Sequence, residues 1–185
     1  RMKVSIVIPA YNEEKRIRKT LEKYAEYFDN FYSRSDLDYQ ILVVINGTKD
    51  GTENVIKMCK KIHGKINYVN LKAAGKGFAI KEGFRKSLEQ DYDLIGFVDA
   101  DMATPPEEFR KLIDEIKDCD GVIADRYIVG SKITPRYSFR RVVVSRTYNL
   151  IVRILFSINY KDTQCGAKLF RRKVVESVFE KLNLT

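Results

Sequence analysis

The sequence predicts an α/β fold in which a mostly parallel central sheet carries helices on both faces. The first observation is an alternation, because short runs rich in Val and Ile are separated by stretches with apolar residues at helical spacing. The second is that these runs are apolar almost throughout, as in strands buried on both faces of a parallel sheet. The third is the length of 185 residues, which suits a single domain with one core.

The elements follow one another in order along the first 125 residues. The predicted strands are residues 4–9, 39–45, 66–71, 93–98 and 121–125. The helices predicted between them are residues 13–28, 50–61 and 75–88, and a fourth that follows the fourth strand. We expect Thr104 to be the N-cap of this fourth helix, whose first turn holds Pro105 and Pro106.

Charge divides the chain at the point where the alternation ends. Residues 1–125 hold 21 Lys and Arg against 22 Asp and Glu, whereas residues 126–185 hold 13 against 3. The basic part predicts an anionic partner, which is a phosphate, a membrane surface or a nucleic acid. A helix predicted over residues 139–158 has an apolar face and arginines, so it suits a membrane interface, although an ordinary core helix has the same pattern. No RNA-binding motif or recognition helix is visible, so we expect no nucleic-acid partner.

Several classes of protein fit the composition poorly. Three widely spaced cysteines without a C-x-x-C pair argue against a disulfide framework and a zinc site. The one histidine, His63, follows a helical pattern, so we expect it at the C-terminus of a helix, near the negative end of the helix dipole. A histidine in that position argues against histidine-based catalysis. Neither a signal peptide nor a membrane span is visible, so we expect a cytoplasmic protein that is peripheral to the membrane. The chain stops just after a helical pattern, which suggests a truncated C-terminus.

Four polar stretches follow the first four predicted strands. They are "PAYNEE" (9–14), "NGTKDGT" (46–52), "AAGKG" (73–77) and "DADM" (99–102). Ligands of open parallel sheets bind at the carboxyl ends of the strands. We therefore expect these four loops to form one binding site.

The last of these loops holds two acids, Asp99 and Asp101. In extended backbone their side chains would face the same side, with the small Ala100 leaving room for a ligand. Two bare carboxylates would repel each other, and a divalent cation removes that conflict. Mg²⁺ or Mn²⁺ uses one or two carboxylates and completes its shell with water and phosphate oxygens, so the pair predicts a metal–diphosphate site. The alternative is a helix-capping loop with solvated acids.

Five sequence blocks resemble family 2 glycosyltransferases with the GT-A fold. They are "VSIVIPAYNEE", "VVINGTKDGT", "GKGFAIKEGF", "VDADMATPPEE" and "DTQCGAKLFRR", which occur in the order found in that family. The chain looks most like the branch that loads a hexose onto dolichyl or polyprenyl phosphate, namely the dolichyl-phosphate glucosyltransferases with the mannose synthases as near relatives. The resemblance implies one GT-A domain over residues 1–185. Its nucleotide-sugar-binding half would be 1–125, and its basic acceptor-side half 126–185.

The resemblance also implies roles for single residues. Asp99 would approach the ribose and the diphosphate, Asp101 would bind Mg²⁺ or Mn²⁺, and Gln164 would face the sugar. The residues expected to line the nucleotide-sugar site are Pro9, Ala10, Tyr11, Glu13, Asn46, Lys76, Asp99, Ala100 and Asp101. The arginines expected near the acceptor phosphate are Arg126, Arg140 and Arg141.

The roles that the resemblance implies for Asn46 and Lys76 each have an alternative. The family usually has an aspartate at the position of Asn46, and the amide can still bond a base edge without the charge that favours an imino donor. This leaves UDP-glucose and GDP-mannose both open as donors. For Lys76, the alternative to a nucleotide contact is an exposed lysine in the first turn of a helix.

The predicted reaction is a single inverting displacement. The second pKa of a phosphate is about 6, so an acceptor phosphate is already a nucleophile and needs no general base. A saccharide hydroxyl would need a base, and Asp162 is the only acid among residues 126–175. Two other classes remain open. A nucleotidyltransferase would need a glycine-rich loop after the first strand, which is absent, and a non-catalytic membrane-surface module gives no reason for the four loops.

Overall fold

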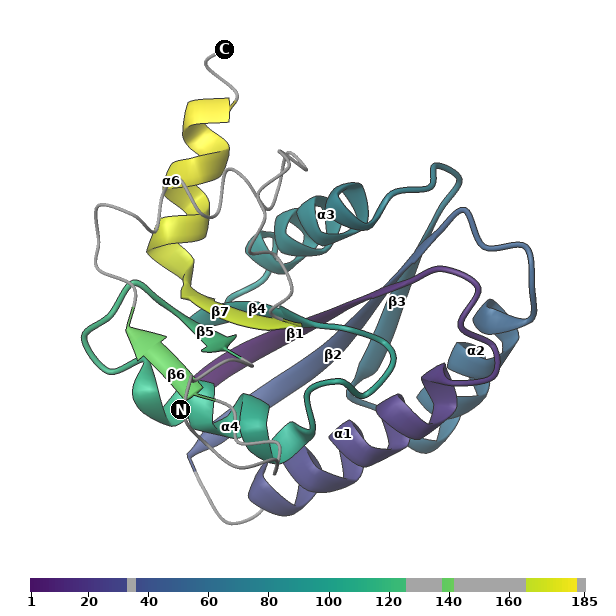
Figure 1. Cartoon of the computed structure of the whole chain (residues 1–185), viewed down its shortest axis with the longest axis horizontal. Helices are drawn as coiled ribbons and strands as arrows, with labels where there is room; N and C mark the ends of the chain where they lie inside the picture. The colour runs from purple at the N-terminus through teal and green to yellow at the C-terminus, as the bar shows by residue number, and fades with distance from the viewer. Residues whose placement is uncertain (33–35, 126–137, 142–165, 183–185) are drawn as a thin grey trace.

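The structure, a computed structural model, describes residues 1–32, 36–125, 138–141 and 166–182 (Figure 1). Within these ranges the strands form one sheet in the order β3-β2-β1-β4-β7-β5-β6. The strands are β1 (Met2–Ala10), β2 (Leu37–Asn46), β3 (Ile66–Leu71), β4 (Leu94–Val98), β5 (Gly121–Asp125), β6 (Ser138–Arg141) and β7 (Ala167–Arg171). The helices are α1 (Ile17–Tyr32), α2 (Thr52–Ile62), α3 (Lys76–Leu88), α4 (Pro106–Glu115) and α6 (Arg172–Leu182).

The sheet is parallel in its first half and antiparallel in its second. β3, β2, β1 and β4 run parallel, with Val4 of β1 between Tyr39 of β2 and Leu94 of β4. β7 lies antiparallel between β4 and β5, and β6 pairs antiparallel with β5. The mostly parallel sheet predicted from the sequence is confirmed. The insertion of β7 was not predicted, because the pattern of a strand does not specify its partner.

Helices cover both faces of the sheet, as predicted. Figure 1 shows α3 and α6 on one face and α1, α2 and α4 on the other. A hydrophobic core lies on each face of the sheet, and side chains that alternate along β1 contribute to both. Ile6 and Ile8 pack on the side of α1, and Val7 packs on the side of α3. Burial of each such side chain contributes roughly 1.5–3 kcal/mol. α3 approaches closely because Gly83 faces the sheet, where an added Cβ would lie 2.4 Å from Val7 Cγ1.

The predicted helix over residues 139–158 is wrong at its start. Residues Ser138–Arg141 form β6, whose backbone pairs with β5 from Val122↔Arg141 to Asp125↔Ser138. Pairing with a neighbouring strand overrides the helical pattern there, as tertiary context often does. Residues 142–158 lie outside the described part of the chain.

Two local predictions about helix ends have opposite outcomes. Thr104 is not the N-cap of α4, because Pro105 takes that position in extended backbone and its carbonyl accepts the N–H groups of Glu108 and Phe109. Pro106 then occupies the first helical position, where its missing N–H costs nothing. His63 does lie at the C-terminus of α2, as expected, with its N–H donated to the carbonyl of Cys59.

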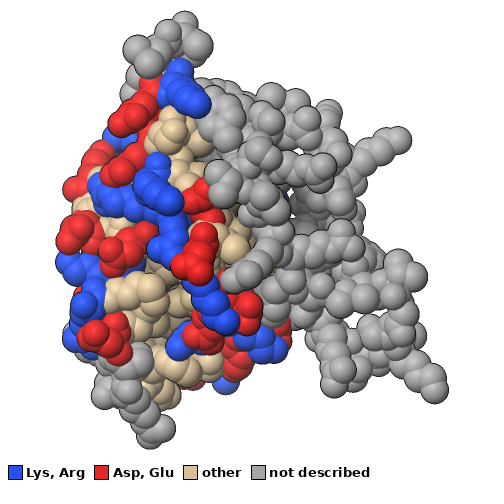
Figure 2. All heavy atoms as spheres, turned by 90° about the vertical axis from the view of Figure 1, so that its left-hand side faces the viewer, with Lys and Arg blue, Asp and Glu red and all other residues tan. Residues whose placement is uncertain are grey.

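The described surface has no marked excess of one charge on the face seen in Figure 2. Basic and acidic side chains are interspersed there, and many form ion pairs along the helices. Most of the basic part of the chain, residues 126–185, lies outside the described ranges. Only residues 138–141 and 166–182 of it are described. A search of the described helices finds none that combines the length and the apolarity needed to cross a membrane.

Candidate active site

A pocket of about 700 Å³ lies at the carboxyl ends of β1, β2 and β4. All four predicted polar loops contribute residues to its lining. Its lining residues are Pro9, Tyr11, Glu13, Arg16, Asn46, Ala74, Gly75, Lys76, Asp99, Ala100 and Asp101. The prediction that these loops meet at one edge of the sheet is therefore confirmed.

The structure gathers most of the predicted residues but not all. Ala10 is buried at the end of β1 and is not among the lining residues. For Arg140 and Arg141 the structure gives the backbone, in β6, but not the side chains. Arg126, Asp162 and Gln164 lie outside the described residues.

Asp99 and Asp101 reach the pocket from a turn rather than from extended backbone. β4 ends at Val98, and the chain then turns, with Met102 in left-handed conformation at φ 64°. Asp101 Oδ1 accepts the N–H of Ala103 at 2.9 Å, which closes this turn. Both acids line the same pocket, but Asp101 lies in a turn and not in the extended backbone from which the expectation was made.

Helix α1 holds this turn in place from the other side. The hydroxyl of Thr20 donates to the carbonyl of Ala100 at 2.7 Å, and the hydroxyl of Tyr24 donates to the carbonyl of Thr104 at 2.7 Å. Both donors are almost fully buried, so each bond is protected from water. Two buried hydroxyl groups that the sequence patterns did not identify therefore join the segment 100–104 to α1.

Lys76 forms an ion pair with Asp99 across the pocket. Its Nζ lies 2.5 Å from Asp99 Oδ1. Lys76 opens α3, after Gly75 at φ 142°, a conformation that favours glycine. The lysine is thus directed at Asp99, while its predicted contact with a nucleotide stays a prediction.

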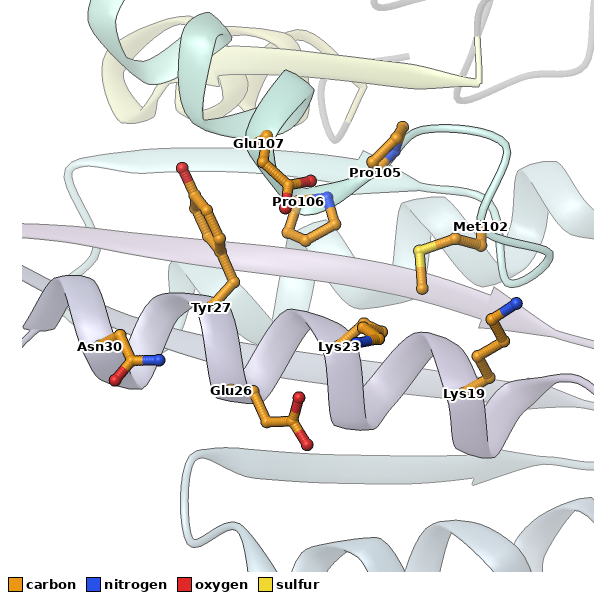
Figure 3. A pocket seen from close by; sticks show the side chains of 9 residues that line it. All are labelled: Lys19, Lys23, Glu26, Tyr27, Asn30, Met102, Pro105, Pro106 and Glu107. Carbon is orange, nitrogen blue, oxygen red and sulfur yellow. The ribbon is translucent and has the colours of Figure 1, made fainter.

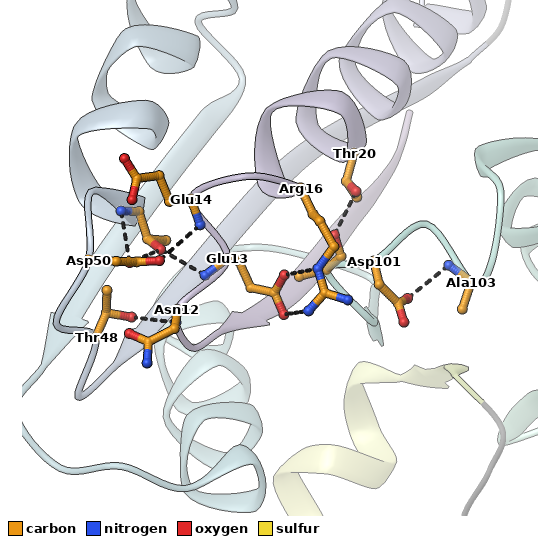
Figure 4. Close-up of polar contacts among 11 residues, drawn as sticks. Asn12, Glu13, Glu14, Arg16, Thr20, Thr48, Asp50, Asp101 and Ala103 are labelled. Carbon is orange, nitrogen blue, oxygen red and sulfur yellow. Dashed lines mark hydrogen bonds and ion pairs between the residues drawn. The ribbon is translucent and has the colours of Figure 1, made fainter.

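Hydrogen bonds join the loop after β1 to the loop after β2 (Figure 4). The N–H of Asn12 donates to Thr48 Oγ1, and Asn12 Oδ1 accepts the N–H of Lys49 at 2.9 Å. The N–H of Glu13 donates to Thr52 Oγ1 at 2.8 Å. Burial acts to raise the pKa of the nearby Asp50 carboxyl, but hydrogen bonds from Thr52 and from the loop backbone hold that pKa below its ordinary value. These bonds fix the position of the first loop relative to β2.

Asn46 has a buried amide oxygen that lacks a hydrogen-bond partner within the described ranges. The residue is 2% exposed, it lines the pocket, and its Oδ1 accepts no hydrogen bond. A buried polar atom without a partner is costly, so a ligand that donates a hydrogen bond to Asn46 would remove that cost. The ring of Tyr11, which is half exposed, lines the same pocket.

Glu13 and Arg16 form a two-bond ion pair at the edge of the pocket. Arg16 Nε donates to one Glu13 carboxylate oxygen and an Nη group donates to the other, each at 2.8 Å. Arg16 lines the pocket but was not predicted from the sequence motifs. The available signal was its spacing, three residues after Glu13 at the start of a helix, where such pairs form.

The two acids fit a divalent metal that shares its shell with a substrate. Within the described ranges no group of three or more His, Cys, Asp or Glu side chains is placed to hold a metal. Two carboxylates are nevertheless enough for Mg²⁺ or Mn²⁺ when water and phosphate oxygens complete the shell. The pocket therefore suits a metal that binds together with a diphosphate.

A second hollow of about 390 Å³ lies between α1 and the start of α4 (Figure 3). It is lined by Lys19, Lys23, Glu26, Tyr27, Asn30, Met102, Pro105, Pro106 and Glu107. Its charged side chains come from α1 and from the first turn of α4, and none comes from the carboxyl end of a strand. The pocket at the carboxyl ends of the strands is the better candidate.

Known proteins resemble the chain in sequence. The model of the family described as "Glycosyl transferase family 2" matches residues 5–179. A dolichyl-phosphate beta-glucosyltransferase of Trichomonas vaginalis is 35% identical over 184 residues, which is 95% of this chain and 55% of the relative. A dolichol-phosphate mannosyltransferase of Pyrococcus furiosus is 34% identical over 181 residues, 96% of this chain and 48% of the relative. The chain spans about half the length of these curated relatives.

Solved structures resemble the chain in fold. A mannosyltransferase of Pyrobaculum calidifontis, solved with GDP-Man and Mn²⁺, matches with a TM-score of 0.60 at 18% identity over 95% of this chain and 46% of that one. A 4-diphosphocytidyl-2C-methyl-D-erythritol synthase of Anaerococcus prevotii matches with a TM-score of 0.61 at 21% identity over 100% of this chain and 78% of that one. Together with the sequence match, these likenesses confirm the GT-A fold. The fold alone does not separate a glycosyltransferase from a nucleotidyltransferase, and the family match does.

Proposed function

Since the chain belongs to glycosyl transferase family 2 and is a glycosyltransferase, we propose that it transfers a hexose from a nucleotide-diphosphate sugar to polyprenyl or dolichyl phosphate, with inversion at the anomeric carbon. UDP-glucose and GDP-mannose are the two candidate donors, in keeping with the glucosyl- and mannosyltransferases among the relatives. The observation that carries the proposal is the pocket that joins Asp99, Asp101 and Asn46 at the carboxyl ends of three strands.

The donor is held by parts of this pocket that differ in chemistry. Tyr11 offers a ring face to the base, and the amide of Asn46 offers an acceptor to a base N–H. Asp99 and Asp101 would hold Mg²⁺ or Mn²⁺, and the bound ion would supply positive charge to the diphosphate. Lys76, already beside Asp99, supplies a further positive charge there. All of these residues precede residue 126, which supports the assignment of residues 1–125 as the nucleotide-sugar-binding half.

The reaction needs one bond to form and one to break. A phosphate oxygen of the acceptor attacks C1 of the sugar, and the bond from C1 to the diphosphate breaks, so the nucleoside diphosphate leaves. The acceptor phosphate is already anionic, so the protein need not remove a proton. The residues proposed to hold that phosphate are Arg126, Arg140 and Arg141, because a guanidinium binds two phosphate oxygens at once.

The acceptor also suggests where the protein works. A polyprenyl phosphate lies in a membrane with its phosphate at the surface. Residues 126–161 contain eight Lys and Arg residues and no acid, which suits an anionic surface. We propose on this basis that the protein works at a membrane surface, on its cytoplasmic face.

The test is a transfer assay with the whole chain. Purified protein is incubated with labelled UDP-glucose or GDP-mannose, Mn²⁺ and polyprenyl phosphate in phosphatidylcholine vesicles, and label in the lipid extract is counted. We expect transfer from one donor and a loss of about a hundredfold or more in Asp101→Asn, since the metal site supplies several kcal/mol of charge stabilisation. The matched control is Asp91→Asn, an exposed acid that pairs with Lys3 away from the pocket and is expected to keep full activity.

Two results would contradict the proposal. Transfer that is equal in Asp101→Asn and the wild type would remove the two acids from the mechanism. A hundredfold loss in a folded Asp162→Asn variant would indicate a general base and therefore a hydroxyl acceptor. The anomeric configuration of the product, read by NMR, tests inversion separately.

A further inference from the structure

We propose that Arg16 is a further contact for the diphosphate of the donor, and that Glu13 is the residue that positions it. The inference rests on the proposed function and adds a residue to its donor site. Arg16 lines the same pocket as Asp99 and Asp101, although it comes from the turn before α1 and not from a strand end.

The first support is that the guanidinium of Arg16 is held rigidly although it is exposed. Its side chain is 61% exposed, whereas that of Glu13 is 13% exposed. The two parallel 2.8 Å bonds to the Glu13 carboxylate fix the plane of the guanidinium. Glu13 is itself anchored, because its N–H donates to Thr52 Oγ1 and its carbonyl accepts the N–H groups of Arg16 and Ile17. Arg16 therefore meets a ligand in a fixed orientation.

The second support is the part of Arg16 that Glu13 leaves free. Glu13 engages Nε and one Nη nitrogen, and the other Nη nitrogen has no hydrogen-bond partner among the described residues. Figure 4 shows the guanidinium on the side of the Glu13 carboxylate that faces Asp101. A guanidinium has donors only, so its free edge selects a ligand that accepts hydrogen bonds, and phosphate oxygens match it well.

The third support is the charge balance of the pocket. Its described lining holds three acids, Glu13, Asp99 and Asp101, and two cations, Arg16 and Lys76. A diphosphate that enters beside three carboxylates needs more positive charge than one metal ion provides. Lys76 supplies it from α3 and Arg16 supplies it from the α1 side, so the two cations come to the pocket from different elements.

An arginine two residues further along, within α1, provides a matched control. Arg18 also pairs with a glutamate, Glu22, one turn further on, but through one contact of 3.5 Å, and it does not line the pocket. Removal of either arginine deletes an ion pair at the start of α1 or just before it, and exposed pairs contribute only about 0–1 kcal/mol to stability. A difference between the two variants in ligand binding therefore reports on the pocket.

The experiment compares ligands with and without the diphosphate. The affinities of UDP and GDP in the presence of Mn²⁺ are measured by calorimetry, and those of uridine and guanosine by NMR titration, for the wild type, Arg16→Gln and Arg18→Gln. In Arg16→Gln we expect about tenfold weaker binding of the preferred nucleoside diphosphate, as for the loss of a charge-assisted hydrogen bond. Nucleoside binding should stay within about twofold, and Arg18→Gln should match the wild type throughout.

Two further readouts separate a ligand contact from a structural role. The salt dependence of diphosphate binding should become shallower in Arg16→Gln, because one ionic contact is gone. Glu13→Gln should weaken diphosphate binding by less than Arg16→Gln, and the double variant should bind no worse than Arg16→Gln, since both changes act through one guanidinium. Melting temperatures of all variants check that the fold is intact.

The outcomes are distinguishable. Equal diphosphate affinity in Arg16→Gln and the wild type overturns the inference and leaves the proposed function standing. Equal losses for nucleoside and nucleoside diphosphate also overturn it, because they place Arg16 beside the base or the ribose. A wild type that binds neither UDP nor GDP overturns the proposed function itself, and the inference with it.

Discussion

Replacement of Thr20 by valine tests whether α1 holds the two acids in place. Valine has nearly the shape of threonine, so Thr20→Val opens no cavity and removes only the hydroxyl that donates to the carbonyl of Ala100 at 2.7 Å. Thr20 is 1% exposed and Ala100 is 4% exposed, so water does not replace the lost donor. A buried acceptor left without its partner costs about 1–3 kcal/mol, which is the expected loss in the free energy of unfolding. We expect the turn that carries Asp99 and Asp101 to move so that the carbonyl of Ala100 reaches water, which would recover part of that free energy but displace the two acids.

Urea denaturation measures the loss of stability, and calorimetry with Mn²⁺ and the preferred nucleoside diphosphate measures the effect on the site. We expect binding to weaken about three- to tenfold, equivalent to about 0.7–1.4 kcal/mol. Thr20→Ser keeps the hydroxyl and should bind normally. Tyr39→Phe is the control for stability alone, because the buried hydroxyl of Tyr39 donates to the carbonyl of Ala25 and to Asp29 Oδ1, away from the pocket.

Two results would refute this reasoning. If Thr20→Val is as stable as the wild type, the hydrogen bond to Ala100 contributes nothing. If Thr20→Val and Tyr39→Phe lose similar stability and both bind the nucleotide normally, the hydroxyl stabilises the fold but does not position the acids.

The remaining predictions concern packing, pH and the ion pair of the site. In Gly96→Ala the new Cβ would lie 2.5 Å from a backbone carbonyl of β7, so a loss of about 2 kcal/mol or more in unfolding free energy is expected, whereas the open site of Gly64 should accept alanine at little cost. Burial raises the pKa of Tyr92 from 10.0 to about 12, so its contribution to stability is complete below pH 10.0 and is lost as the pH rises through 12. Alkaline unfolding curves of Tyr92→Phe should show a smaller loss over that range, and equal curves would contradict the shift. Lys76→Met removes the cation 2.5 Å from Asp99 Oδ1 and should weaken nucleotide binding several-fold with little change in melting temperature, because exposed ion pairs add only about 0–1 kcal/mol.

The first half of the fold follows from local patterns in the sequence. β3 and β5 have the predicted bounds, and β1, β2 and β4 differ from prediction by one or two residues at their ends. α1 begins at Ile17 rather than at residue 13, because the backbone first makes a turn in which the carbonyl of Glu13 accepts two N–H groups. Runs of buried Val and Ile specify such strands because both faces of the sheet are covered.

The second half and the details of the site depend on contacts between distant residues. The place of β7 between β4 and β5 joins segments more than 40 residues apart, and no local pattern encodes it. The bonds of Thr20 and Tyr24 to the turn after β4 likewise cross 80 residues. The rule that ligands bind at the carboxyl ends of parallel strands predicted the location of the pocket, but the rule names loops and does not name the residues that hold them.

Calorimetric titration of the whole chain with UDP and with GDP, each with and without Mn²⁺, tests the central claim most directly. We expect one of the two to bind, with an affinity that depends on Mn²⁺ and that is lost in Asp101→Asn but not in Asp91→Asn. Binding of that nucleotide would also identify the donor. If the folded wild type binds neither nucleotide, or binds one equally well without metal and without Asp101, the pocket is not a metal–diphosphate site.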